Sequence, residues 1–171
     1  MIKIILNGCN GRMGQAVSKI AATDADVTIV AGVDKFPGTA AHSFPIFASF
    51  AELKNIEANV IIDFSRPEAL QSMLEYAVKQ HIPVVIATTG IDEDNKEIIK
   101  NASQNIPIFM ATNMSIGISV LTELAQRAAY ILGNTFDIEI IEKHHNQKED
   151  APSGTALSIA NAINDVLSKR K

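Results

Sequence analysis

The sequence contains no tryptophan, and aromatic residues make up only 5% of its 171 positions. A chain so poor in aromatic rings argues against a platform on which the bases of single-stranded nucleic acid stack. An excess of positive charge is also absent, because 15 lysines and arginines stand against 19 aspartates and glutamates, giving a net charge of −4. Neither a nucleic acid nor a membrane surface is therefore expected as a partner.

Cysteine and long apolar runs are scarce as well. Cys9 is the single cysteine, so no disulfide can form within the chain, and a reducing cytoplasm is the expected location. No stretch approaches the length of a membrane-spanning helix, and the apolar run at Ile2–Leu6 is too short for a signal peptide. A content of 47% hydrophobic and 20% charged residues nevertheless supports a packed core, in one domain or in one domain and part of a second.

Short apolar segments rich in isoleucine and valine alternate with stretches of helical periodicity. The spacing predicts helices over Arg12–Ala22, Pro67–Lys79 and Glu93–Ser103. Asp34–Phe47 has glycine, proline and no clear period, so a loop with room for a short extra strand is expected there. The alternation predicts an α/β fold, with a doubly wound, mostly parallel sheet and helices on both faces. The five expected strands are Ile2–Leu6, Val27–Val33, Asn59–Ile62, Pro83–Ala87 and Ile106–Met110.

The pattern changes after Met110. Ile118–Leu132 is expected to be a helix that stops at Gly133-Asn134, and Pro152–Leu167 is expected to be a second helix. Between them, Phe136–Glu142 alternates apolar and acidic residues, which predicts a half-buried strand. Since so few elements bury little by themselves, this region is expected to be the start of a second α+β domain.

A glycine-rich turn follows the first expected strand and opens the first expected helix. It reads Gly8-Cys9-Asn10-Gly11-Arg12-Met13-Gly14, and its glycines allow a tight backbone that can approach a pyrophosphate at the helix N-terminus. Asp34 lies 20 residues beyond Gly14, where a Rossmann-type fold places its ribose-binding acid. Lys35 beside it can meet a 2′-phosphate, so both NAD and NADP stay open. The alternative is a turn that binds nothing, because GxxGxxG spacing alone is a weak pattern.

Two further turns close later strands at the same edge of the expected sheet. Ala87-Thr88-Thr89-Gly90 can pass its backbone close to a nicotinamide, and Ala111-Thr112-Asn113-Met114 occupies the same position after the next strand. By residue type alone, plain strand-end turns are the favoured interpretation of both. Arg66, beside Pro67 at a helix start, is expected to be a solvated charge.

The candidate catalytic groups follow the last expected strand. His144 and His145 end that strand, and an imidazole can act as a general acid or base near neutral pH. Lys148 can donate a proton or stabilise negative charge. A helix is expected to begin at Ser153-Gly154-Thr155, and the backbone N–H groups of these residues can hold a carboxylate.

This stretch has two other interpretations. A metal site made by the histidines with Glu142 and Asp150 is disfavoured, because the spacing matches no HExxH-like pattern and Lys148 would repel a cation. No metal is therefore expected. A polar surface loop followed by an ordinary helix cap is the remaining alternative.

The same stretch resembles a known enzyme family. Glu139–Ala156, which reads EIIEKHHNQKEDAPSGTA, is similar to the signature of the 4-hydroxy-tetrahydrodipicolinate reductase (dihydrodipicolinate reductase) family. Gly8–Gly14 resembles the glycine loop of that family, including the Arg-Met pair before the last glycine. Asp63–Ser65, Thr88–Gly90 and Asn113–Gly117 fall where the family has its later motifs, so the resemblance covers the whole chain.

The resemblance implies an NADH- or NADPH-dependent reductase of lysine and diaminopimelate biosynthesis. Its substrate is a small cyclic dicarboxylate, 4-hydroxy-tetrahydrodipicolinate, and its product is tetrahydrodipicolinate. His144 would be the proton donor/acceptor and Lys148 a second proton donor, while His145, Gly154 and Thr155 would bind the substrate carboxylate. The residues implied around the cofactor are Gly8, Cys9, Asn10, Gly11, Arg12, Met13, Asp34, Ala87, Thr88, Thr89, Ala111, Thr112, Asn113 and Met114.

The chain departs from the family pattern in three respects. Ala87 stands where the family usually has glycine, and Thr112 where it often has proline or alanine. Family members also continue past the last helix, with a part that completes the substrate domain and builds a tetramer. We therefore expect residues 1–113 to form the dinucleotide-binding domain and residues 114–171 to form part of a substrate-binding and tetramerisation domain. Its exposed face is expected to cause either self-association or marginal stability.

Two alternative functions remain open. One is a cofactor-binding fragment without catalytic activity, which would bind NADH and turn nothing over. The other is a different small-substrate NAD(P)-dependent dehydrogenase, although such an enzyme would not need the stretch around His144 and Thr155.

Overall fold

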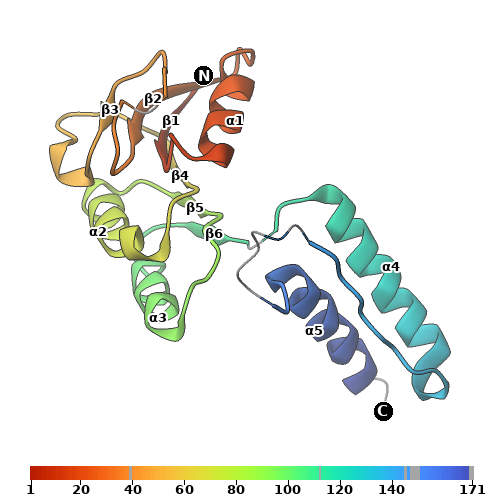
Figure 1. The fold of residues 1–171 in the computed structure, drawn as a ribbon. Coiled ribbons are helices and arrows are strands. Elements are labelled where there is room, and N and C mark those ends of the chain that lie inside the picture. The colour runs from red at the N-terminus through yellow and green to blue at the C-terminus, as the bar shows by residue number, and fades with distance from the viewer. Residues whose placement is uncertain (39, 112, 145, 147–150, 170–171) are drawn as a thin grey trace. The chain divides into compact units, whose positions relative to one another are not determined.

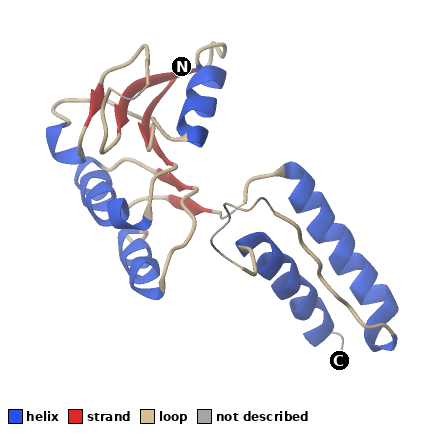
Figure 2. Cartoon of the chain, in the orientation of Figure 1, coloured by secondary structure: helices blue, strands red, loops and turns tan. Residues whose placement is uncertain are grey.

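The chain divides into two compact units, Met1–Ala111 and Thr112–Lys171 (Figure 1). The computed structural model describes residues 1–38, 40–111, 113–144, 146 and 151–169. The first unit contains a sheet with flanking helices, and the second contains two long helices (Figure 2). Within the described ranges, none of the helices is both long and apolar enough to cross a membrane.

The strands of the first unit are β1 (Ile2–Asn7), β2 (Val27–Val33), β3 (Ile46–Phe47), β4 (Val60–Asp63), β5 (Val84–Ile86) and β6 (Ile108–Met110). They form one parallel sheet in the order β3-β2-β1-β4-β5-β6. This order confirms the predicted doubly wound sheet, since the chain moves outward from β1 to β3 and then returns to the other side of β1 at β4. The short strand expected within Asp34–Phe47 is β3.

The helices of the first unit are α1 (Arg12–Ala21), α2 (Leu70–Gln80) and α3 (Glu93–Ala102), with short 3-10 turns at η1 (Phe50–Glu52) and η2 (Pro67–Ala69). Right-handed crossovers place α1 on one face of the sheet and α2 and α3 on the other (Figure 1). Pro67 opens η2, where its missing N–H is not needed. Asp92 caps α3 by accepting a hydrogen bond from the Asn95 N–H.

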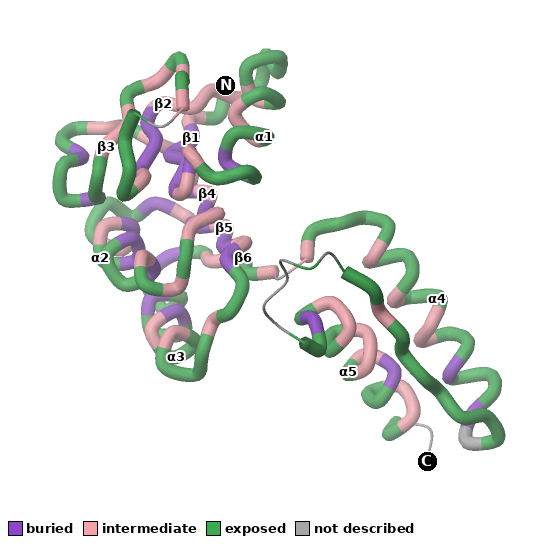
Figure 3. Tube along the Cα trace, in the orientation of Figure 1, coloured by how far each residue is buried: buried purple, intermediate pink, exposed green. Residues whose placement is uncertain are grey.

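The main core of the first unit lies between the sheet and α2 and α3. Ile5 of β1, Ile61 of β4 and Ile86 of β5 have no exposed surface, and Met73 and Leu74 of α2 pack into the same cluster. Figure 3 shows buried stretches along these strands and along α2. Burying a side chain of this size stabilises the fold by roughly 2 kcal/mol. The buried central strands hold their carboxyl ends in place, and the candidate site lies at those ends.

The second unit consists of α4 (Ile116–Leu132) and α5 (Gly154–Ser168), which pack against each other. Gln126 of α4 donates a hydrogen bond of 3.1 Å to the carbonyl oxygen of Ala162. After α4 the chain makes a 3-10 turn, η3 (Gly133–Thr135), at the predicted stop signal. The structure therefore confirms both helices predicted for this region, with small shifts at their ends.

The half-buried strand predicted at Phe136–Glu142 is wrong. The segment forms no strand, and Ile138, Ile140 and Ile141 are 45%, 41% and 83% exposed. A strand requires a neighbour that pairs with its backbone, and the described part of the second unit contains no second strand. The alternating pattern predicts an extended backbone correctly, but it does not supply the pairing partner.

Candidate functional site

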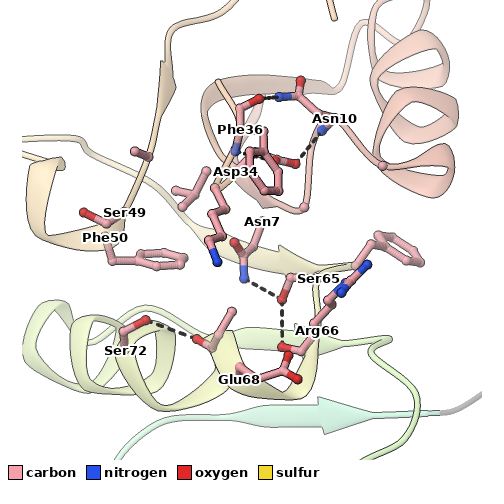
Figure 4. A pocket seen from close by; sticks show the side chains of 17 residues that line it. Asn7, Asn10, Asp34, Phe36, Ser49, Phe50, Ser65, Arg66, Glu68 and Ser72 are labelled. Atoms are coloured by element: carbon pink, nitrogen blue, oxygen red, sulfur yellow. Dashed lines mark hydrogen bonds between the residues drawn. The ribbon is translucent and has the colours of Figure 1, made fainter. Parts of the chain in front are cut away.

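The turns that follow β1 and β4 lie side by side, at the point where the strand order reverses. Ligands of doubly wound sheets bind outside the carboxyl ends of the strands at such a point. A cavity of about 930 Å³ opens there (Figure 4), which is within the usual size of a small-molecule site. Its walls come from the glycine loop, from residues 34–36 after β2, from Ser49 and Phe50, and from residues 64–66 after β4.

Two glycines of the loop are required by its geometry. Gly8 has a φ of 74°, and a Cβ atom there would lie 2.6 Å from the carbonyl oxygen of Phe64. A Cβ atom on Gly14 would lie 2.2 Å from the carbonyl oxygen of Gly8. These contacts bring the loop tightly against both the β4 turn and the start of α1.

The backbone N–H groups in the first turn of α1 are available to bind an anion. Gly11 stands at the N-cap position, and no side chain caps the free N–H groups that follow it. Arg12 and Met13, the next two residues, are exposed. An uncapped helix N-terminus at a switch point can hold the phosphates of a dinucleotide.

Asp34 lies at the rim of the same cavity, where the sequence predicted it. One carboxylate oxygen accepts a hydrogen bond of 3.0 Å from the Asn10 N–H, and the other accepts one of 3.1 Å from the Phe36 N–H (Figure 4). Asn10 in turn donates to the carbonyl oxygen of Phe36 and lies 3.1 Å from Nε2 of His42. The acid that is expected to bind ribose is thus held in one orientation by the glycine loop.

The two cations near this rim, Lys35 and Arg66, are exposed and line the cavity. The Lys35 ammonium group lies 5.8 Å from the centre of the Phe36 ring. Arg66 is solvated, as expected, yet it borders the cavity, which its residue type alone did not indicate.

Cys9 lies within the loop but faces the protein interior. Its side chain has no exposed surface and packs against Gly32 of β2. Burial, and then the nearby Asp34 carboxylate, raise the pKa of the thiol to about 11. Cys9 can therefore support the loop, but its sulfur is neither exposed to a ligand nor a thiolate near neutral pH.

In the turn after β5, the side chain of the first threonine, Thr88, is bonded within the protein. The Thr88 hydroxyl is buried and donates a hydrogen bond of 2.7 Å to Asp63, at the end of β4. Ala87 donates its N–H to the carbonyl oxygen of Asp63, and only Thr89 of the three predicted residues is exposed. Any contact that Thr88 makes with a cofactor must come from its backbone. The prediction did not include Asp63, although its place at the end of an apolar strand was a usable signal.

The predicted catalytic segment in the second unit is joined to the N-terminus of α5. Glu142 accepts hydrogen bonds of 2.8 Å and 2.5 Å from the N–H and hydroxyl of Ser153, the N-cap of α5. Nδ1 of His144 lies 3.7 Å from a carboxylate oxygen of Glu142. His144 is therefore brought to the helix start at Gly154 through Glu142, which the sequence suggested only as a metal ligand.

Thr155 is joined to the beginning of the same unit. The Asn113 side-chain amide donates a hydrogen bond of 2.9 Å to the Thr155 hydroxyl. Ala111 ends the first unit and donates its N–H to the carbonyl oxygen of Ile86, while Met114 is 45% exposed.

Thr112, His145 and Lys148 lie outside the described residues, as does Asp150 of the alternative metal site. Among the side chains that are described, no group of three potential metal ligands comes together.

Comparisons with known proteins agree on one family. The model described as dihydrodipicolinate reductase, N-terminus, matches residues 2–114, and that described as dihydrodipicolinate reductase, C-terminus, matches residues 117–171. The chain belongs to the dihydrodipicolinate reductase family. This confirms the resemblance seen in the glycine loop and in Glu139–Ala156.

Curated relatives in this family are similar over the whole chain. A 4-hydroxy-tetrahydrodipicolinate reductase from Caldanaerobacter subterraneus subsp. tengcongensis is 51% identical over all 171 residues. One from Clostridium tetani is 46% identical over 165 residues, or 96% of the chain. The chain spans 66% and 64% of the lengths of these two relatives.

Solved structures support the same fold. A dipicolinate-bound dihydrodipicolinate reductase from Paenisporosarcina sp. TG-14 superposes with a TM-score of 0.77 at 29% identity, covering all of this chain and 68% of that one. The WlbA dehydrogenase from Bordetella pertussis, with a TM-score of 0.58 at 17% identity, covers 75% of this chain and 42% of its own and shows a likeness in fold alone. The predicted Rossmann-type sheet is thereby confirmed.

Proposed function

We propose that this chain is an NAD(P)H-dependent oxidoreductase that reduces 4-hydroxy-tetrahydrodipicolinate to tetrahydrodipicolinate in lysine and diaminopimelate biosynthesis. The observation that carries the proposal is that a reductase-family chain has an uncapped helix N-terminus at the switch point of its sheet. The relative solved with dipicolinate supports a small cyclic dicarboxylate as the substrate class.

The first unit supplies the cofactor site in this proposal, with residues 1–113 as the dinucleotide-binding domain. The N–H groups at the start of α1 hold the pyrophosphate, and Asp34 accepts hydrogen bonds from ribose hydroxyls. Lys35 lies where it can neutralise a 2′-phosphate, so the chain uses NADH or NADPH. The bound dihydronicotinamide supplies a hydride.

Residues 114–171 supply proton transfer and substrate binding. The substrate would lose its 4-hydroxyl as water and gain the hydride and one proton; His144 donates that proton, and Lys148 is a second proton donor. His145 and the α5 N-terminus at Gly154 and Thr155 bind a substrate carboxylate, which the positive end of the helix stabilises. Glu142 lies within reach of both His144 and Ser153, so the proton donor and the carboxylate site share one support.

Replacement of His144 tests this assignment. His144→Ala should lower kcat at least about 100-fold, because general acid catalysis is lost, while NADH binding stays unchanged. His81→Asn is a suitable control, since His81 is exposed, has a φ of 55° that asparagine tolerates, and lies in the other unit. Turnover of His144→Ala at the parent rate would contradict the role given to this imidazole.

A chain that binds the cofactor without catalysis is the second candidate, favoured by the cavity at the glycine loop, which is lined by residues of the first unit alone. It predicts that calorimetric titration detects NADH binding, while no NADH is oxidised when the dicarboxylate is added. The reductase proposal predicts both binding and oxidation, so one pair of measurements separates the candidates.

We further propose that the chain works in the cytoplasm and assembles as a homotetramer through residues 114–171. The free and buried Cys9 is compatible with a reducing compartment. Helix α4 exposes Ile116, Leu121 and Leu124, with 82%, 51% and 59% of their surfaces accessible. Exposed apolar side chains gathered on one helix support an interface.

A further inference from the structure

Asp63 is a fully buried carboxylate at the end of β4. Its Oδ1 accepts hydrogen bonds from Asn7 Nδ2 at 2.8 Å and from the Ser65 N–H and hydroxyl at 3.1 Å and 2.5 Å. Its Oδ2 accepts the bond from the Thr88 hydroxyl at 2.7 Å. In the described parts of the chain, no lysine, arginine or histidine forms an ion pair with Asp63. These four hydrogen bonds are therefore what offsets the removal of the carboxylate from water.

The partners of Asp63 belong to three different strand ends. Asn7 is the last residue of β1 and directly precedes Gly8, Ser65 lies in the turn after β4, and Thr88 lies in the turn after β5. Asn7 Nδ2 also lies 3.0 Å from the Ser65 hydroxyl, so the cluster is connected on more than one side (Figure 4). One carboxylate thus fixes the spacing of the turns at the switch point.

The glycine loop depends on the same spacing. The backbone of Gly8 packs against Phe64, the residue between Asp63 and Ser65, so closely that a Cβ atom would not fit. A displacement of the β4 turn would therefore displace the loop and the start of α1. An apolar residue in the position of Asp63 would avoid the cost of burying a charge, so packing alone does not account for an acid here.

We propose that Asp63 is a positioning residue for the dinucleotide: it holds the turns after β1, β4 and β5 in the arrangement that binds the pyrophosphate and the nicotinamide. The inference rests on the proposed cofactor function. Asp63 acts through Asn7, Ser65 and Thr88, because its own side chain is buried beneath them.

The test compares Asp63→Asn with a variant that is destabilised elsewhere. Asparagine keeps the shape of aspartate but replaces one acceptor oxygen with an NH₂ group, which leaves at least one of the four donors unpaired. Calorimetric titration with NADH should give a Kd at least about tenfold higher than that of the parent. Ile99→Ala in α3 is the control, since Ile99 is a core residue outside the cofactor site and its truncation also lowers the melting temperature. The control should bind NADH within about twofold of the parent.

A Kd for Asp63→Asn that equals that of Ile99→Ala would overturn the inference, because loss of stability alone would then account for the change in NADH affinity. If Asp63→Asn does not fold, Thr88→Val carries the test: it removes a single donor to Oδ2 and should raise the Kd at least about threefold. Parent-like binding by that variant would likewise overturn the inference. Failure of the parent itself to bind either NADH or NADPH would overturn the proposed function and this inference together; a parent that binds only NADPH would be tested with NADPH in the same way.

Discussion

Cys9, Asp34 and Thr88 each stand in a turn that is expected to meet the cofactor, yet each uses its side chain within the protein. The Cys9 sulfur packs against Gly32, the Asp34 carboxylate accepts two backbone N–H groups, and the Thr88 hydroxyl donates to Asp63. At the turns of Cys9 and Thr88 the cofactor is therefore expected to meet backbone N–H groups, whereas each Asp34 oxygen keeps a lone pair that can accept from a ribose hydroxyl. The order of strands, glycines and helices was enough to locate the turns in the sequence. The directions of the side chains depend on partners that are distant in sequence and could not be predicted.

Because of Cys9, the free energy of unfolding should fall as the pH rises above about 9. The thiol is protonated in both the folded and the unfolded chain below pH 9, but above it the unfolded chain loses the proton first, because burial raises the folded pKa from 9.0 to about 11. The contribution of Cys9 is thus complete below pH 9 and is lost as the pH rises to about 11, by up to roughly 2 kcal/mol. Denaturant unfolding at a series of pH values should show a steeper loss for the parent than for Cys9→Ala. Parallel curves for the two proteins would contradict the buried thiol.

Helices in this chain begin in two different ways. α3, α4 and α5 start with the side-chain caps Asp92, Ser115 and Ser153, whereas α1 starts at Gly11 without one. The difference is readable from residue types, because glycine has no side-chain oxygen to offer. What the sequence does not reveal is that Ser153 is also bonded to Glu142, 11 residues earlier.

The start of α1 should not accept a side chain at Gly14. Gly14→Ala should lower the free energy of unfolding by about 2 kcal/mol or more and weaken NADH binding at least about tenfold, because the new Cβ atom collides with the Gly8 carbonyl. Gly117→Ala is the matched control, since a Cβ atom there meets only the Ser115 hydroxyl at 3.7 Å. That change should be neutral or slightly stabilising in a helix. The account of the loop fails if both alanines have the same effect on NADH titration.

The cap of α5 should be worth more than that of α4. Ser153→Ala removes both the cap and the hydroxyl bond to Glu142, so it should cost about 2 kcal/mol, whereas Ser115→Ala should cost about 0.5 kcal/mol. Urea unfolding of the two variants measures the difference. Equal losses would show that the contact with Glu142 does not stabilise the helix start.

Across the whole molecule, how far the sequence predicts structure depends on where each element finds its partners. The strands of the first unit pair with one another, and their order follows from the crossovers of βαβ units. Phe136–Glu142 has the composition of a strand, but the described residues of its unit offer it no neighbour. Composition could predict the extended backbone of this segment. Whether an extended segment pairs with a strand depends on which elements the folded chain brings beside it.

The exposed apolar residues of α4 should cause self-association. Light scattering should detect oligomers in the parent, because burial of Ile116, Leu121 and Leu124 between copies removes apolar surface from water. Leu124→Glu should shift the population toward the monomer, since a charge at an apolar interface is costly. A parent that stays monomeric at high concentration would contradict the assembly proposed for residues 114–171.

The central claim is that this chain transfers a hydride from a bound dihydronicotinamide to a cyclic dicarboxylate. Deuterium placed at both C4 positions of NADH and of NADPH follows that hydride directly, and the product can be analysed by mass spectrometry. The account predicts that the chain converts 4-hydroxy-tetrahydrodipicolinate to a product carrying one deuterium, and that His144→Ala forms far less of it. Formation of no product, or of a product without deuterium, would contradict the account.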